Sequence, residues 1–139
     1  MTSTSLHRAF EAAATGRIVW GALALLAPGL NLRVAGVGDR DTPEMRYLIR
    51  VFGARAAALG LGYLLADEDE RRRWRRICLF VDTTDTAHGA AHVIRGDIRR
   101  GSAAALTAAT GTYATLGLIG LMSDRKAGIS WRGGRPGPA

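Results

Sequence analysis

Two residue types that often carry chemistry are almost missing from this chain of 139 residues. It contains one cysteine, Cys78, and one lysine, Lys126. A single cysteine excludes an intrachain disulfide and leaves the redox compartment undecided. The net charge of +7 therefore rests on arginine, whose planar and permanently charged side chain suits phosphate in lipid headgroups or in nucleic acid.

The sequence also lacks the short motifs of catalysis. It has no phosphate-binding loop, no nucleophile elbow, no Cys-x2-Cys and no His-Glu-x2-His pattern. Glu11 and Arg17 interrupt the apolar core that a signal peptide would need, so we expect the first apolar block to remain in the mature chain. These features predict a protein that is not an enzyme and that holds no cofactor.

Strand patterns are missing as well, because the period-two alternation of strands and the Asn-Gly turns of hairpins do not occur. The chain instead has four blocks rich in Ala, Leu and Gly, at about 10–30, 46–66, 76–95 and 102–122. Each has about 20 residues, enough at about 1.5 Å per residue to cross a hydrocarbon core of about 30 Å. Thr42 and Pro43 are typical of the N-cap and first position of a helix. The sequence predicts an all-α chain.

The apolar blocks fit a membrane better than a soluble bundle. The last block has no charged residue between Ser102 and Met122, and its hydroxyl residues are scattered around the helix. A soluble helix would keep one polar face toward water. We therefore predict a four-helix transmembrane bundle formed by residues 1–122 and located in the inner (plasma) membrane. A disordered basic tail rich in glycine and proline should follow at 123–139.

Arginine predicts the orientation of such a bundle. Four crossings place both termini on one side, which then carries ten basic residues against seven on the other. The positive-inside rule favours cytoplasmic termini. The polar interval 67–76 between the second and third blocks contains a basic run, which is expected to contact anionic lipid headgroups. The run consists of Arg71, Arg72, Arg73, Trp74, Arg75 and Arg76. The alternative is a solvated run that the preceding acidic residues partly neutralise.

The third block carries four ionisable side chains in an otherwise apolar helix. They are spaced by 3, 3 and 4 residues, and they are Asp82, Asp85, His88 and His92. At about 100° per residue these spacings form one stripe no wider than about 120°. The rest of the helix is apolar or small, so we expect the stripe to point into the bundle.

Two arginines in other blocks lie at depths that match the aspartates. Arg17 falls about 8 Å inside the cytoplasmic edge of the bundle, level with Asp82. Arg55 falls about 16 Å from the same edge, near the level of Asp85. A charge inside a bilayer is expensive unless it is paired. We therefore predict one ion pair between Arg17 and Asp82 and another between Arg55 and Asp85.

The role of this polar centre is open to four interpretations. A metal ion could bind Asp85, His88 and His92, but the other blocks hold no histidine and no second half of a di-metal site, and we predict no metal. Aspartate and histidine within a membrane also suggest a proton or ion relay. The third interpretation is a pocket for a lipid headgroup, a quinone or another amphipathic ligand. The simplest is a structural network of ion pairs that sets the helix register.

Segments of the second and third blocks resemble a known family. The run "RVFGARAAALGLGYLL", followed by a basic turn and "LFVDTTD", resembles small four-helix bacterial membrane proteins that are frequent in actinobacteria and are defined as a domain of unknown function. The matching positions are Gly53 and Arg55 in the second span and Asp82 and Asp85 in the third. The layout is also similar to that of DoxX-type proteins. The resemblance implies a fold and a membrane location, and it supplies no catalytic residues.

Together these patterns predict an accessory, scaffolding or small-ligand-binding membrane subunit. Its polar centre comprises Arg17, Arg55, Asp82, Asp85, His88 and His92. The alternative is a small proton or ion carrier, or a redox-linked protein that binds quinone or lipid, acting through Asp85, His88, His92 and Arg55. Expected partners are anionic membrane lipids and either further copies of the chain or a larger membrane complex, and nucleic acid is not expected.

Overall fold

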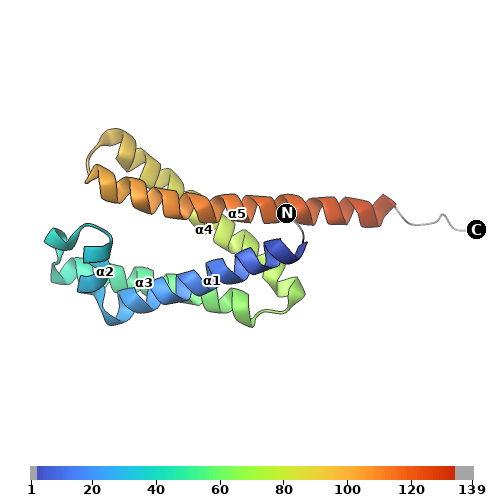
Figure 1. Ribbon diagram of the computed structural model, residues 1–139, viewed down its shortest axis with the longest axis horizontal. Helices are drawn as coiled ribbons and strands as arrows, with labels where there is room; N and C mark the ends of the chain where they lie inside the picture. The colour runs from blue at the N-terminus through green and yellow to red at the C-terminus, as the bar shows by residue number, and fades with distance from the viewer. Residues whose placement is uncertain (1–2, 134–139) are drawn as a thin grey trace, which may run out of the picture.

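The computed structural model describes residues 3–133, and every element in that range is helical. Residues 3–133 form five α-helices and one short 3-10 helix, and Figure 1 shows how they are arranged. In chain order they are α1 (Ser3–Leu26), α2 (Pro28–Val34), η1 (Gly38–Arg40), α3 (Pro43–Leu65), α4 (Glu68–Arg95) and α5 (Arg100–Gly133). The predicted all-α class is confirmed.

Helix ends follow local capping rules. Thr42 caps α3 as predicted, because its hydroxyl accepts a hydrogen bond of 3.2 Å from the backbone N–H three residues on, and Pro43 is the first helical residue. Asp67 caps α4 by accepting a bond of 2.9 Å from the N–H of Glu70. Gly96 ends α4 with a φ of +67°, a left-handed conformation that glycine adopts without steric cost.

The third block begins earlier than the sequence predicts. Residues 67–76 were expected as an interval between two blocks, but they supply the N-cap and first turns of α4. Acidic residues in the first turn stabilise the positive end of the helix dipole, and Asp69 pairs with Arg72 one turn later. Glutamate and arginine are also strong helix formers. Charge in this segment therefore promotes a helix rather than a loop.

The first block is divided, contrary to the prediction of one helix over 10–30. Pro28 has no N–H to continue the hydrogen-bond ladder of α1, so the helix stops at Leu26. Pro28 instead opens the short helix α2, where a missing N–H at the first position costs nothing.

The last block is longer than predicted. It was expected to end at residue 122, but α5 continues to Gly133, because the sequence has no proline between these positions to stop the helix. Residues 123–133 are therefore helical rather than disordered. Residues 134–139 of the expected tail lie outside the described part of the chain.

The long helices form two antiparallel pairs. α1 packs along α3 and α4 packs along α5, whereas contacts between the pairs are sparse and lie mainly between α3 and α4. In Figure 1 the α1–α3 pair lies below α5, and α4 passes from one level to the other. At one end Ser102 donates a hydrogen bond of 3.1 Å to the carbonyl of Gly36, and Arg99 pairs with Asp39 at 3.1 Å. The segment containing α2 and η1 therefore connects the two pairs at that end.

Small residues bring the backbones of α1 and α3 together. A Cβ atom on Gly53 would lie 2.7 Å from the Cβ of Ala24, and one on Gly60 would lie 2.5 Å from the carbonyl oxygen of Ala14. Both distances are shorter than van der Waals contact, so a larger residue requires the helices to separate. Close backbone packing of this kind takes the place of the hydrophobic effect, which lipid does not supply between helices.

In the described part of the chain, three helices are long and apolar enough to cross a membrane, namely α1, α3 and α5. Large apolar side chains on these helices face outward, including Leu26, which is 85% exposed, and Leu65, which is 81% exposed. Outward apolar faces over small-residue packing indicate a membrane protein. By composition α4 does not qualify as a membrane span, because its charged residues lower its hydropathy. Of the four predicted crossings, three are therefore supported.

The glycine contact between α1 and α3 gives the first prediction. Gly60→Ala should lower the free energy of unfolding by about 1–3 kcal/mol, because the added methyl group meets the Ala14 backbone. Gly111→Ala is the matched control, since its nearest neighbour would lie at an ordinary 3.6 Å. The measurement is the denaturant midpoint in mild detergent, and equal midpoints for the two variants would contradict the close packing.

Candidate functional site

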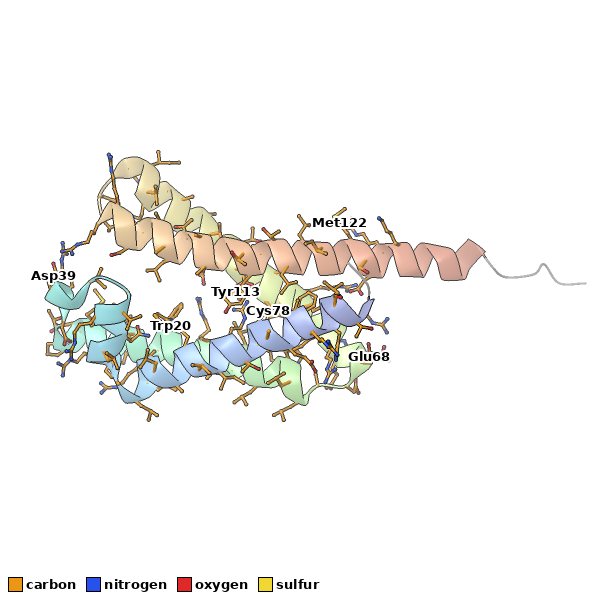
Figure 2. All side chains as sticks on the ribbon, viewed as in Figure 1. Trp20, Asp39, Glu68, Cys78, Tyr113 and Met122 are labelled. Atoms are coloured by element: carbon orange, nitrogen blue, oxygen red, sulfur yellow. The ribbon has the colours of Figure 1, made fainter. Side chains whose placement is uncertain are left out.

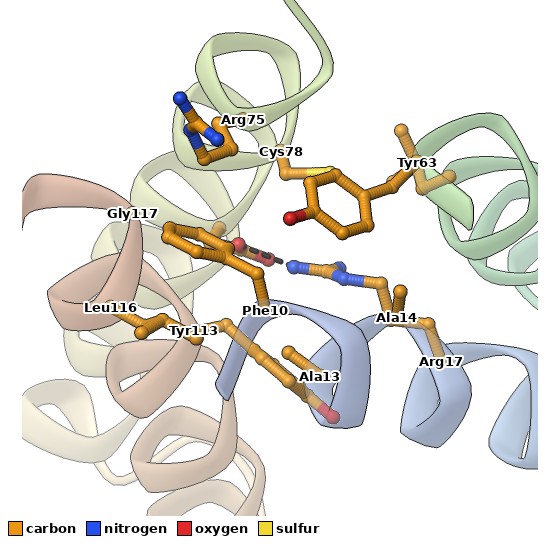
Figure 3. A pocket seen from close by; sticks show the side chains of 12 residues that line it. Phe10, Ala13, Ala14, Arg17, Tyr63, Arg75, Cys78, Tyr113, Leu116 and Gly117 are labelled. Carbon is orange, nitrogen blue, oxygen red and sulfur yellow. Dashed lines mark hydrogen bonds and ion pairs between the residues drawn. The ribbon is translucent and has the colours of Figure 1, made fainter. Parts of the chain in front are cut away.

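A buried ion pair connects α1 to α4. Nη2 of Arg17 donates to Oδ2 of Asp82 at 2.5 Å, and the two side chains are 11% and 3% exposed. The guanidinium also lies over the ring of Tyr113 on α5, 4.4 Å from its centroid. Figure 3 shows this pair between the two helix pairs, with Tyr63 and Phe10 beside it. The pair predicted from matching depths is confirmed.

A second ion pair connects α3 to α4 one turn further along. Nη2 of Arg55 donates to Oδ2 of Asp85 at 2.5 Å, as predicted. This pair is more open, with side chains 44% and 27% exposed, and the guanidinium lies 5.1 Å from the ring centroid of Phe52. Asp82 and Asp85 are therefore both neutralised by arginines from the opposite helix pair.

Hydroxyl groups hold α4 against α5 near the same level. Thr86 donates to the backbone carbonyl of Asp82 at 2.6 Å and lies 3.0 Å from the hydroxyl of Thr110. Further along, the side chain of Thr107 occupies the space where Gly89 would carry a Cβ atom. These contacts fix the rotation of α4 against α5, and in that rotation Asp82 and Asp85 reach the arginines of α1 and α3.

A third ion pair was not predicted. Nη2 of Arg75 on α4 donates to both carboxylate oxygens of Asp124 on α5 at 2.9 Å, and Arg75 lies over the ring of Phe10 at 5.4 Å. From the sequence, Arg75 is predicted as a headgroup contact and not as an ion-pair partner. The missed signal is that two antiparallel helices joined by a short loop bring together residues at similar distances from the loop.

The basic run 71–76 is divided by the helix into an inner and an outer face. Arg71 donates to the carbonyl of Ala66 at 3.0 Å, and the Trp74 ring fills the space beside Gly62. Arg71, Trp74 and Arg75 are thus partly buried, and the predicted contact of the run with lipid headgroups stays a prediction. The exposed members are Arg72, Arg73 and Arg76.

The two histidines do not extend the polar centre. His88 is exposed, and its Nδ1 contacts the carbonyl of Thr84 on its own helix at 2.8 Å. His92 lies nearer the loop, where its Nδ1 is 2.7 Å from Oδ1 of Asp97. This hydrogen bond lowers the pKa of Asp97. The expectation that the whole stripe points inward is wrong for His88, because at that level the two helix pairs have separated.

No three His, Cys, Asp or Glu side chains within residues 3–133 come together in a group that could hold a metal ion. Asp85 and His88 in particular face different directions, since one is paired with Arg55 and the other bonds its own helix. A metal site formed by Asp85, His88 and His92 therefore has no geometric support.

A cavity of about 300 Å³ lies between the two helix pairs, and we call it the inter-pair cavity. Charged residues of both predicted ion pairs line it, together with aromatic and apolar side chains from all four long helices. Its walls are formed by Gly16, Arg17, Trp20, Phe52, Arg55, Ala56, Leu59, Val81, Asp82, Asp85, Leu106, Ala109, Thr110 and Tyr113. Figure 2 shows Trp20 and Tyr113 on opposite sides of the space between the pairs. Neither histidine of α4 contributes to it.

A smaller cavity of about 20 Å³ lies on the other side of the Arg17–Asp82 pair. The Tyr63 hydroxyl and Nε of Arg75 line it, and neither atom has a hydrogen-bond partner among the described residues. A space of this size holds one water molecule. The polar centre is thus enclosed on this side by Phe10, Tyr63 and Cys78, as Figure 3 shows.

Comparison of the chain with known protein families, with curated proteins and with solved structures finds no match. The resemblance to four-helix bacterial membrane proteins therefore stays a prediction.

The two ion pairs should differ in how much they stabilise the protein. Asp82→Asn leaves Arg17 buried without a counter-charge and should cost about 3–5 kcal/mol. Asp85→Asn should cost less, about 1–3 kcal/mol, because Arg55 remains partly exposed. The measurement is unfolding of the purified protein in mild detergent.

A double-mutant cycle separates pairing from simple damage. Arg17→Gln combined with Asp82→Asn should recover part of the loss, with a coupling free energy of about 1–3 kcal/mol. Asp41→Asn is the control, since Asp41 pairs with Arg46 outside the cavity. Strictly additive losses for Arg17 and Asp82 would show that the pair does not form.

Proposed function

We propose that the chain is a four-span protein of the inner (plasma) membrane that binds a small amphipathic molecule in the inter-pair cavity. One observation carries the proposal. Four charged side chains that neutralise one another line a cavity of about 300 Å³ instead of being packed shut. Small-molecule sites typically have volumes of about 300–1,000 Å³ and combine apolar walls with a few placed polar groups.

The fourth crossing is α4. Its segment 77–94 has 18 residues and a length of about 27 Å, close to the thickness of the hydrocarbon core. The aspartates that lower its hydropathy are both paired with arginines of neighbouring helices, which reduces the free energy needed to place them in the bilayer. Four crossings put both termini on one side, and the excess of arginine there favours the cytoplasm.

The exposed arginines at the start of α4 support the same orientation. Arg72, Arg73 and Arg76 face outward where α4 enters the proposed membrane, and Arg125 lies near the corresponding end of the α5 span. We propose that they contact anionic headgroups, each contributing about 1 kcal/mol near the surface.

Ligand binding fits the cavity better than catalysis or a proton relay across the membrane. The two carboxylates in it are each bound to an arginine, so neither is free to act as a general base unless a ligand takes its place on the arginine. A relay through His88 and His92 lacks a continuous path, because neither residue reaches the inter-pair cavity. A purely structural network would need only the ion pairs, whereas these ion pairs line a cavity of about 300 Å³. We therefore propose a non-catalytic, ligand-binding subunit.

Topology is tested by cysteine labelling in a Cys78→Ser background. Arg40→Cys and Gly101→Cys should react with a membrane-impermeant maleimide in intact spheroplasts. Glu68→Cys and Ser123→Cys should react only after permeabilisation, because four crossings place them in the cytoplasm. All four sites are exposed in the structure, so labelling depends on the side of the membrane.

Two outcomes would contradict this arrangement. Labelling of Ser123→Cys from outside, with Glu68→Cys protected, would show that α4 does not cross. Labelling of all four sites in intact spheroplasts would show that the sites do not lie on opposite sides of the membrane.

A further inference from the structure

The inter-pair cavity is electrically neutral, but its arginines are more exposed than its aspartates. In each ion pair the arginine is the more exposed partner, with Arg55 44% and Asp85 27% exposed. Within residues 3–133 Arg55 makes a single hydrogen bond, through Nη2. Its remaining N–H groups are therefore available to an acceptor in the cavity.

The groups that face Asp85 define the charge balance of the site. Arg55 lies on α3, Arg17 on α1, Asp82 on the same helix as Asp85, and Tyr113 on α5. The two arginines and two aspartates cancel. An anion that entered alone would leave a net negative charge in a low-dielectric site, which is unfavourable. A proton that enters with the anion keeps the site neutral.

The cavity opens toward the side of the protein. Phe52 on α3 and Leu106 on α5 line it and are 36% and 45% exposed, so they form its rim. In the proposed four-span arrangement this rim faces the hydrocarbon core of the bilayer. A ligand that enters there carries an apolar chain, and its polar end must reach Arg55.

We propose that the inter-pair cavity binds a single-chain carboxylic acid taken from the bilayer, with its carboxylate on Arg55 and its proton on Asp85. The acid enters in its neutral form. Its O–H bond breaks, the proton transfers to the Asp85 carboxylate, and the ligand carboxylate replaces Asp85 as the partner of Arg55. Charge is zero before and after. This inference rests on the proposed ligand-binding function and adds the class of ligand and the residue that takes the proton.

The probe is a dodecanoic acid brominated on its chain, added to the full-length protein in phosphatidylcholine nanodiscs. Bromine quenches tryptophan fluorescence at short range, and Trp20 lines the cavity. Quenching should saturate in the wild type. In Trp20→Phe the saturable part of the quenching, which comes from the cavity, should be lost. Arg55→Gln should weaken binding at least tenfold. Arg55→Gln combined with Asp85→Asn keeps the cavity neutral and hydrogen-bonded, so it should fold by circular dichroism and still fail to bind.

The proton is tested by comparing variants between pH 6 and pH 8. Partition of the acid into the bilayer is the same for all variants, so a difference in slope reports on the site. The dissociation constant for the acid should rise with pH more steeply in the wild type than in Asp85→Asn, which cannot accept the proton. The difference should be about a factor of ten for each pH unit. Asp41→Asn and Arg46→Gln alter an ion pair outside the cavity and should behave as the wild type.

Other outcomes would overturn the inference in distinguishable ways. Equal slopes for wild type and Asp85→Asn would reject proton transfer to Asp85. Saturable quenching by a brominated dodecanol or by a brominated anionic phospholipid, without quenching by the acid, would reject the carboxylic acid and retain a ligand site. If no brominated amphiphile quenches Trp20, the proposed function fails as well.

Discussion

The cost of placing a carboxylate within an apolar helix is the constraint on which the rest of this structure depends. Asp82 is almost fully buried, and it is tolerated because Arg17 crosses from the opposite helix pair to bond it at 2.5 Å. Neither group could remain charged at that depth without the other. The pair therefore determines both the position of α4 and the side of α1 that faces it.

The remaining contacts fit the need to pair these charges between the two helix pairs. Glycine and alanine pack α1 directly on α3, and threonine hydroxyls and small residues hold α4 on α5, so each helix pair is tight within itself. Between the pairs the bulky charged and aromatic side chains keep the backbones apart. The inter-pair cavity follows from this contrast, since two close-packed pairs joined mainly by long side chains leave space between them.

The sequence was sufficient for the parts of the structure that depend on depth and periodicity. The helical class and the pairs Arg17–Asp82 and Arg55–Asp85 could be predicted, because the rise of a helix places those residues at matching heights. The start and end of each helix were harder to predict. α4 begins within a charged segment that resembles a loop in composition, and Pro28 opens a second helix inside a block that was expected to form one. Local capping and dipole effects decide both.

The site was less predictable than the pairs because it depends on how far the helix pairs diverge. Residues on one stripe of α4 meet different surroundings along its length: Asp85 faces α3, whereas His88 faces outward. The periodicity of the sequence does not predict the angle at which the two helix pairs diverge. The pair between Arg75 and Asp124 was missed for a related reason, since it depends on the register of α4 against α5.

The most direct test is to determine the structure of the protein in lipid nanodiscs at a resolution that defines side chains. In that structure α4 should cross the bilayer, and Arg17 and Asp82 should lie within hydrogen-bond distance of each other. The inter-pair cavity should open toward lipid between Phe52 and Leu106. A structure in which the two helix pairs close on one another and Arg17 turns to the headgroup region would contradict this arrangement.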